Sequence, residues 1–245
     1  MTATINNSSV LLSGAAALLF AATFMFGGQF RPFGRLITDQ RSLISFAAGS
    51  SAAYVFVHLM PELDEVRHTF LESVKFSIHL EGEAIYFIAL IGFLFFYGLQ
   101  HLRTRFAGGD KGDLDFKIHV GGFAAYVWLV SYLLANQLKE SADSILLYSI
   151  AMALHFLSID YALREEHDRN YQTKGRRLLA GMAIFGWGTG VLFALSDGFM
   201  AALTAFISGA IIMNSAVSEL PQQKDGRFMP FLLGGVIYAL ILLPL

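Results

Sequence analysis

The run "YSIAMALHFLSIDYAL", residues 148–163, sets two ionisable side chains, His155 and Asp160, in an almost wholly apolar segment. An ionised carboxylate at the centre of a membrane helix costs about 2.5–3.5 kcal/mol on insertion scales, so a function is the first hypothesis for such a residue. Imidazole and carboxylate groups bind divalent cations, and imidazole also handles protons near neutral pH. His155 and Asp160 are therefore candidate metal ligands.

The spacing of these two residues restricts what they can do together. Residues five apart on an ideal helix are separated by roughly 140° of rotation, whereas ligands of one ion normally lie three or four positions apart. A site built on this pair would need partners from other helices. Two structural alternatives stay open: Asp160 can pair with Arg164 four residues later, and a buried neutral His155 can hydrogen-bond across helices.

A second pair of candidate metal ligands, His58 and Glu62, lies in the stretch "HLMPE". The two residues are four positions apart and share one face of a helix, where a cation could first bind. Alternatively, Pro61 ends the helix and both side chains meet water. The charged run 164–169 could likewise attract metal or be an ordinary solvated loop.

The composition defines the class of protein that must position these residues. Over 245 residues the chain is 55% hydrophobic and 15% charged, whereas soluble domains carry about a quarter charged residues. This composition indicates an integral membrane protein. The absence of cysteine excludes disulfides and thiolate metal sites, so a metal would be held by His, carboxylate, amide or Met ligands. The net charge of -2 gives no indication of nucleic-acid binding.

A membrane-crossing helix needs roughly 20 mostly apolar residues, and the sequence offers eight candidates joined by short connections. We therefore expect an all-α, polytopic membrane protein with eight transmembrane helices and a single domain over residues 1–245. The predicted spans are Ser9–Phe30, Leu43–Leu63, Ala84–Leu102, Ile118–Ala135, Ile145–Leu163, Leu178–Leu195, Met200–Leu220 and Phe228–Leu245.

The basic residues predict the orientation of these spans, because Lys and Arg favour the cytoplasmic side of short loops. The first, third, fifth and seventh loops hold 14 of the 17 Lys and Arg residues, and only Arg67, Lys75 and Lys139 lie in the other loops. Both termini should therefore face outside. We expect a multi-pass protein of a cell membrane, with a bacterial inner membrane as the expected setting.

The second and seventh spans, "FAAGSSAAYVFVHLMPE" and "FISGAIIMNSAVSELPQ", align without a gap. The identical pairs are Phe46 with Phe206, Gly49 with Gly209, Val57 with Val217, and Pro61 with Pro221. Because the two spans run in opposite directions, the match predicts an inverted repeat that relates helices 1–3 to helices 6–8. Such repeats recur in transporters. The alternative is chance, since Phe, Gly and Val are common in membrane helices.

The stretch "SFAAGSSAAYVFVHLMPEL" resembles the second helix of the ZIP family of zinc and iron permeases, in which F-A-A-G is followed by H-L-x-P-E. Eight helices, both ends outside and a "G…LP" seventh helix are also similar to that family. The resemblance implies a ZIP-like transporter of a divalent metal cation, with zinc or iron as substrate. It implies no tightly bound cofactor and no enzymatic activity.

The same resemblance points to metal ligands on the fourth and fifth helices. It places His155 and Asp160 at the first and last positions of the family's His-Glu-x-Pro-His-Glu motif, but Phe156, Ser158 and Ile159 replace three motif residues.

The fourth span offers one ionisable residue, His119, which can be laid on the family's histidine. We therefore expect a depleted metal centre that binds single ions weakly. The candidate ligands are His155, Asp160, His58, Glu62 and His119.

Three functional hypotheses follow. The first is a ZIP-like carrier, and the second is a ZIP-like protein that has lost transport and acts as a scaffold, partner subunit or sensor. The third is an intramembrane zinc hydrolase, which the lack of any histidine after His167 disfavours. The expected partners are the lipid bilayer and a metal ion, with a homodimer as one option for assembly.

Overall fold

The computed structural model describes residues 7–29, 39–73, 83–104, 112–136, 142–215 and 227–243. All regular elements in these segments are helical, so the all-α fold class is confirmed. The helices are α1 (Asn7–Phe26), α2 (Gln40–Tyr54), α3 (Met60–Ser73), α4 (Ala84–Thr104), α5 (Gly112–Asn136), α6 (Ala142–Asn170), α7 (Arg176–Leu192), α8 (Asp197–Asn214) and α9 (Phe228–Leu242).

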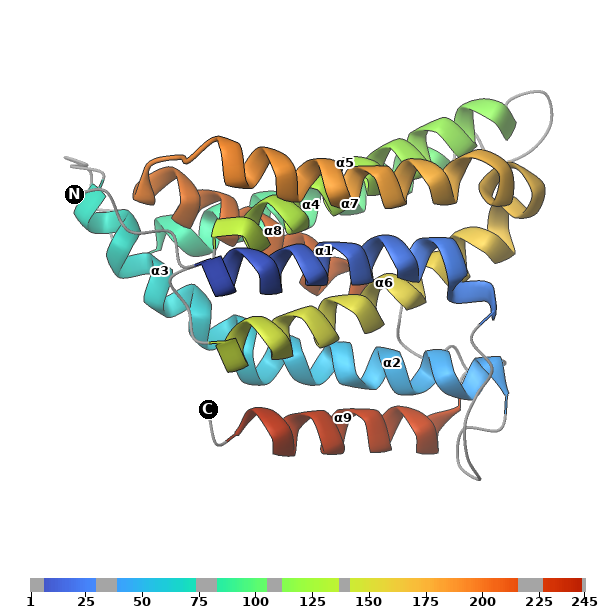
Figure 1. The fold of residues 1–245 in the computed structure, drawn as a ribbon, viewed down its shortest axis with the longest axis horizontal. Coiled ribbons are helices and arrows are strands. Elements are labelled where there is room, and N and C mark those ends of the chain that lie inside the picture. Colours follow the sequence, from blue (N-terminus) through green and yellow to red (C-terminus); the bar gives the residue numbers. More distant parts are fainter. Residues whose placement is uncertain are drawn as a thin grey trace.

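The long helices lie side by side and alternate in direction, and the start of α1 lies at the same end of the bundle as the end of α9 (Figure 1). Six helical segments in the described residues are long and apolar enough to cross a membrane. They are Ser9–Gln29, Gln40–Ser73, Ala84–Leu102, Asp113–Ala135, Ile145–His167 and Asp197–Asn214. Two further predicted spans correspond to the shorter helices α7, of 17 residues, and α9, of 15 residues.

The outer surface of the bundle is apolar. Large hydrophobic side chains are exposed on α1, α4, α7 and α9, among them Leu18, Phe87, Leu94, Phe185 and Leu240. A protein surrounded by water rarely exposes so much contiguous apolar surface, whereas hydrocarbon accommodates it. The length of the helices and this surface together define a multi-pass membrane protein.

The second helical segment continues through Pro61, so the alternative in which this proline ends the helix is wrong. A π-helical turn, Val55–Leu59, joins α2 to α3, and the Met60 amide donates to the carbonyl of Val55. Proline has no N–H to donate, and the wide turn before it shifts the hydrogen-bond register. α3 then leaves the line of α2 at an angle (Figure 1), as expected at a proline or π-helical turn.

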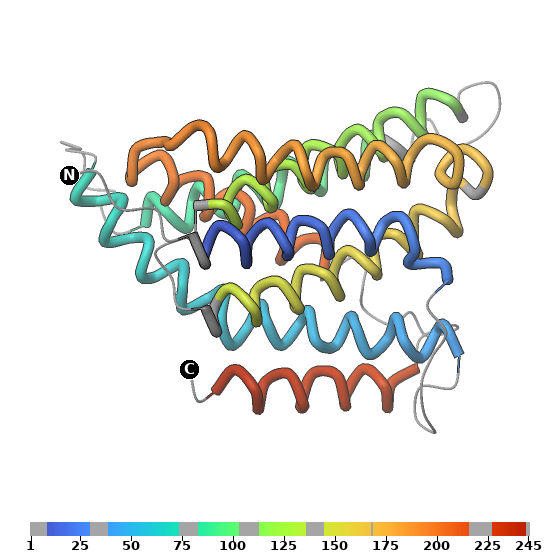
Figure 2. Tube along the Cα trace, viewed as in Figure 1, coloured from blue at the N-terminus to red at the C-terminus, as the bar shows by residue number. Residues whose placement is uncertain are grey.

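The charged run 164–169 is helical rather than a solvated loop. α6 extends to Asn170, and a second π-helical turn, Tyr171–Gly175, leads into α7. The run contains no glycine or proline, and its Arg and Glu residues are good helix formers, so nothing stops the helix before Gly175. The chain reverses direction only at this turn (Figure 2). Glu166 and His167 therefore belong to the same continuous helix as the membrane segment.

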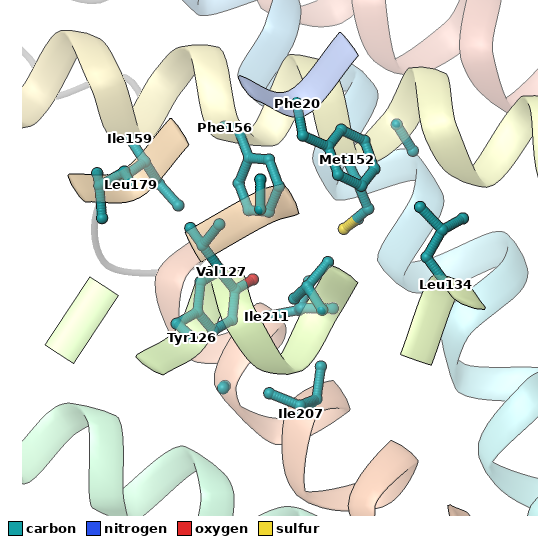
Figure 3. Packing of buried hydrophobic residues seen from close by; sticks show 14 of the residues in the cluster. Phe20, Tyr126, Val127, Leu134, Met152, Phe156, Ile159, Leu179, Ile207 and Ile211 are labelled. Atoms are coloured by element: carbon teal, nitrogen blue, oxygen red, sulfur yellow. The ribbon is translucent and has the colours of Figure 1, made fainter. Parts of the chain in front are cut away.

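The core of the bundle is packed around Phe156 of α6. Its ring lies edge-on to Phe20 of α1, with ring centroids 5.1 Å apart, and 5.2 Å from the ring of Phe24. Figure 3 shows Phe20 and Phe156 together with Met152 of α6 and Ile207 and Ile211 of α8. The middle of α6 is therefore enclosed by neighbouring helices, as its predicted functional role requires.

Two helix pairs approach each other to backbone contact at glycines. A Cβ atom added at Gly49 of α2 would collide with the main-chain carbonyl of Phe231 in α9. A Cβ atom added at Gly209 of α8 would collide in the same way with the carbonyl of Ala89 in α4. In a membrane, where helices gain little from hydrophobic burial against one another, such small residues permit the close packing that holds them together.

The reciprocal contacts complete each seam. Gly234 of α9 faces the carbonyl of Phe46 in α2, and Gly92 of α4 faces the carbonyl of Phe206 in α8. The α2–α9 and α4–α8 pairs are thus built in the same way. Val217 and Pro221, which complete the sequence match between the second and seventh spans, lie outside the described residues.

Gly49→Ala should lower the thermal unfolding midpoint of the detergent-purified protein, because the added methyl group has no room against Phe231. Overpacking of this kind costs about 1–3 kcal/mol. Gly98→Ala on α4 is the matched control, since nothing lies within 4 Å of an added Cβ there, and it should leave the midpoint unchanged or raise it. Equal midpoints for the two variants would contradict the close α2–α9 contact.

Candidate metal site

His155 lies at the centre of the bundle with no exposed surface, so the expectation that it faces the interior is confirmed. Its Nδ1 atom is 3.2 Å from Ser51 Oγ of α2, and its Nε2 atom is 2.7 Å from Tyr126 Oη of α5. Ser51 Oγ is also 3.0 Å from the hydroxyl of Ser215, at the end of α8. Both ring nitrogens are therefore engaged by hydroxyl groups from other helices.

Asp160 is also satisfied by neighbouring side chains. One of its oxygens pairs with Arg164, and the other accepts a 2.7 Å hydrogen bond from the hydroxyl of Tyr171. Burial, reinforced by the charge of Asp160, raises the pKa of Tyr171 well above its ordinary value, so the phenol keeps its proton and donates. The structural alternative for Asp160, pairing with Arg164, is the arrangement observed.

The structure does not join His155 and Asp160 in one ligand set. Their polar atoms contact different partners, and among the described residues neither belongs to a group of three possible metal ligands. The roughly 140° of rotation between them is the physical reason: His155 faces α2 and α5, whereas Asp160 faces Arg164 and the turn after α6.

His58 and Glu62 lie on the continuous segment formed by α2 and α3. Both are partly buried, and the ring of His58 lies 5.2 Å from the ring of Tyr54, one turn earlier. Among the described residues no third histidine or carboxylate joins them. They are thus not part of a three-ligand site in this part of the chain.

His119, the fifth candidate, does belong to such a group. It lies near the start of α5 and meets Glu166 and His167 in the last turn of α6. His119 Nδ1 is 2.9 Å from His167 Nε2 and 3.2 Å from Glu166 Oε2. One possible ligand atom from each of the three residues lies within 4.8 Å of the other two. We refer to these three residues as the His119 cluster.

The dimensions of the His119 cluster suit a small divalent cation. Tetrahedral zinc, with bonds of about 2.0–2.1 Å, places its ligand atoms roughly 3.3 Å apart. The measured separations of 2.9 and 3.2 Å are close to this value, so small side-chain shifts would admit an ion. Two imidazoles and one carboxylate supply three ligands, which is the usual number in zinc sites that keep a position open.

Asp115 stands behind the cluster, one helical turn before His119 on α5. Its side chain is buried, and its Oδ1 atom has no hydrogen-bond partner among the described residues. Its Oδ2 atom lies 4.0 Å from His167 Nδ1, the ring nitrogen that faces away from His119. A carboxylate at this place typically accepts the second N–H of a metal-bound histidine and fixes its tautomer and orientation.

Aromatic side chains hold the two imidazoles in place. Phe116 lies edge-on to His167 with ring centroids 5.4 Å apart, and Phe123 lies 5.2 Å from His119. The side chain of His167 is 7% exposed and that of His119 is 10% exposed, whereas that of Glu166 is 42% exposed. The cluster is therefore enclosed on the histidine side and reached by solvent on the glutamate side.

The sequence alone names His119 as a candidate but does not identify the residues that lie beside it. Glu166 and His167 fall in the charged run 164–169, for which the sequence leaves metal attraction and a solvated loop open, and no local pattern points to Asp115. The signal lay in the topology: the start of the fourth span and the end of the fifth must lie on the same side of the membrane. Residues near these two ends can therefore meet.

A cavity of about 20 Å³ adjoins His119 on the side of α4 and α8. It is lined by Phe96, Gln100 and Asn214 as well as by His119. The Nδ2 atom of Asn214 is buried without a partner among the described residues. A cavity of this size holds about one water molecule and is too small for a hydrated cation.

Comparison of the chain with protein-family models, with curated proteins and with solved structures finds no match. The multi-pass helical bundle and the His119 cluster are therefore the features that indicate a function.

Tyr126→Phe should destabilise the bundle by about 1–3 kcal/mol, because it leaves His155 Nε2 buried without its 2.7 Å partner. Thermal unfolding in detergent measures the effect. Tyr97→Phe is the matched control on the exposed side of α4 and should change stability by less than about 0.5 kcal/mol. If both variants unfold at the midpoint of the unmodified protein, the Tyr126–His155 contact contributes nothing.

Proposed function

We propose that this membrane protein binds a divalent metal cation at the His119 cluster and carries that cation across the membrane as a ZIP-like transporter. The observation that carries the proposal is that one possible ligand atom from each of His119, Glu166 and His167 lies within 4.8 Å of the other two. Nitrogen and carboxylate oxygen ligands suit zinc and iron(II). Zinc or iron is the cargo in this proposal.

The ZIP-like architecture is part of the same proposal. It comprises eight membrane crossings, with the shorter helices α7 and α9 as two of them, and an inverted repeat of helices 1–3 and 6–8. The two glycine seams support the repeat, because Gly49 and Gly209 are among the residues matched in the sequence. Gly49 and Gly209 face the carbonyls of Phe231 and Ala89, whose positions differ by 142. The glycines on the partner helices, Gly234 and Gly92, also differ by 142.

The side of the membrane follows from charge. Apart from Arg67, the described Lys and Arg residues lie on segments at the end of the bundle where α6 ends and α7 begins. By the preference of basic loops for the cytoplasm, that end faces inside and both chain termini face outside. The His119 cluster then lies at the cytoplasmic end of the carrier.

Binding of a cation at the His119 cluster is compatible with a central metal site around His155 that lacks most of the family's ligands. Glu166 and His167 follow His155 by 11 and 12 residues on one helix, which corresponds to a distance of about 17 Å along its axis. A cation in the cluster is therefore separate from the central position that the family resemblance assigns to His155. Movement of a cation between the two would require the bundle to open, since the cavity beside His119 holds about one water.

A second candidate function is a ZIP-like protein that binds the cation without transporting it and acts as a scaffold, partner subunit or sensor. The hydrogen bonds of His155 and the pairing of Asp160 favour this alternative, because both central groups already have protein partners. The His119 cluster serves both functions, so binding and transport must be measured separately.

Glu166→Gln should weaken zinc binding to the purified protein, because it removes the only anionic ligand of the cluster. Competition with a chromophoric chelator measures the affinity. Glu165→Gln is the matched control, since it makes the same charge change at the neighbouring exposed position.

In the same assay, Asp115→Asn should lower the affinity by about 10- to 100-fold, as expected when a carboxylate behind a metal-bound histidine is lost. Equal affinities for Glu166→Gln, Glu165→Gln and the unmodified protein would show that the cation binds elsewhere or not at all.

Proteoliposomes containing the unmodified protein should take up labelled zinc or iron(II), and His119→Ala should reduce the rate because the cation loses a ligand. Manganese and cobalt define the selectivity, and His155→Ala and Asp160→Ala test the central residues. Zinc binding without uptake of any ion, in protein shown to be correctly inserted, would exclude the carrier and leave the non-transporting alternative.

A further inference from the structure

A second cavity adjoins the end of α6 and includes none of the residues of the His119 cluster. It has a volume of about 310 Å³, within the range of roughly 300–1,000 Å³ that is usual for small-molecule sites. Its walls come from the end of α1, from α6, from the turn after α6 and from the start of α7. Figure 1 shows these segments meeting at the end of the bundle away from α3.

The charged groups of this cavity are two arginines and one carboxylate. Arg164 is neutralised by its ion pair with Asp160, whose remaining oxygen accepts from Tyr171. Arg176, the first residue of α7, forms no ion pair of its own among the described residues, although its charge lies near Asp160. Its Nε atom is buried and has no hydrogen-bond partner among the described residues. The cavity therefore has an excess of one positive charge and a buried donor that lacks an acceptor.

Gly27 and Gly28 leave space for the side chains of Asp160 and Arg164 because they have no side chains of their own. A Cβ atom at Gly27 would meet the carboxylate of Asp160, and one at Gly28 would meet the guanidinium of Arg164. The end of α1 thus packs main chain directly against the ion pair, which fixes Arg164 at the cavity wall. Arg164 of α6 and Arg176 of α7 both line this cavity.

The ligand that best matches two arginines in one cavity is an anion with several acceptor oxygens. A guanidinium presents N–H donors in a planar fork that matches phosphate oxygens, and such charge-assisted hydrogen bonds are stronger than neutral ones. A basic pocket between membrane helices on the cytoplasmic side is also the kind of site that binds anionic lipid head groups. A carboxylate metabolite is a poorer match, because the cavity opens at the end of a membrane bundle where phosphate head groups are concentrated.

We propose that this cavity binds a phosphate group through Arg176 and Arg164, either as the head group of an anionic phospholipid or as free phosphate. The site is separate from the His119 cluster, which faces α5, and does not depend on metal binding. Its ligand would join the end of α1 to the α6–α7 turn, and binding should therefore stabilise the protein.

The test uses the full chain, purified and delipidated in a neutral detergent. Phosphatidylglycerol, phosphatidylcholine or inorganic phosphate is added while the thermal unfolding midpoint is recorded. Phosphatidylglycerol should raise the midpoint by about 5 °C at saturation, and phosphatidylcholine should not. Arg176→Gln should abolish this shift, whereas Arg177→Gln, the same charge change at an exposed neighbour outside the cavity, should retain it.

The outcomes separate the sources of phosphate. A shift with the lipid alone identifies a head-group site, and an Arg176-dependent shift with inorganic phosphate identifies a site for the free ion. No shift with either ligand would overturn the proposal, as would equal losses in Arg176→Gln and Arg177→Gln, which indicate diffuse attraction. If Arg176→Gln does not fold, Gly28→Val replaces it, because its side chain would push Arg164 into the cavity and should also abolish the shift.

Discussion

The interior of a helix bundle in hydrocarbon must satisfy its own polar groups, because no bulk water reaches them. In this protein the constraint centres on His155, whose two ring nitrogens contact Ser51 and Tyr126, while Ser51 also contacts Ser215. These contacts join α2, α5, α6 and α8 at one buried point. The cost of leaving any of these groups unpaired therefore fixes how four helices sit around the middle of α6.

Close backbone packing holds the α2–α9 and α4–α8 pairs together. The α2–α9 and α4–α8 pairs meet at Gly49 and Gly209 so closely that main-chain carbonyls take the space a side chain would need. Close contact maximises dispersion between helices that gain nothing from leaving lipid. The polar centre and the two glycine seams hold the helices together, and the His119 cluster and the cavity beside Arg176 lie at the end of the bundle where α6 ends.

Side chains near the end of α6 contribute to both the His119 cluster and the cavity beside Arg176. Glu166 and His167 contact His119 of α5, whereas Asp160 and Arg164 line a cavity with the end of α1 and Arg176. The uninterrupted helix through residue 170 holds both sets of side chains at defined positions. The cation site and the phosphate site that we propose therefore lie near each other but use different side chains.

The sequence by itself predicted the all-helical membrane class and the burial of His155, and it offered the pairing of Asp160 with Arg164 as one of two alternatives, because hydropathy and helical spacing are local properties. It also singled out Gly49 and Gly209. Only the tertiary structure decided that Pro61 lies within a continuous helical segment, that residues 164–170 are helical, and that His119 meets Glu166 and His167. Contacts between side chains 47 and 48 positions apart depend on how α5 and α6 rotate about their axes, and core packing sets that rotation rather than any local pattern.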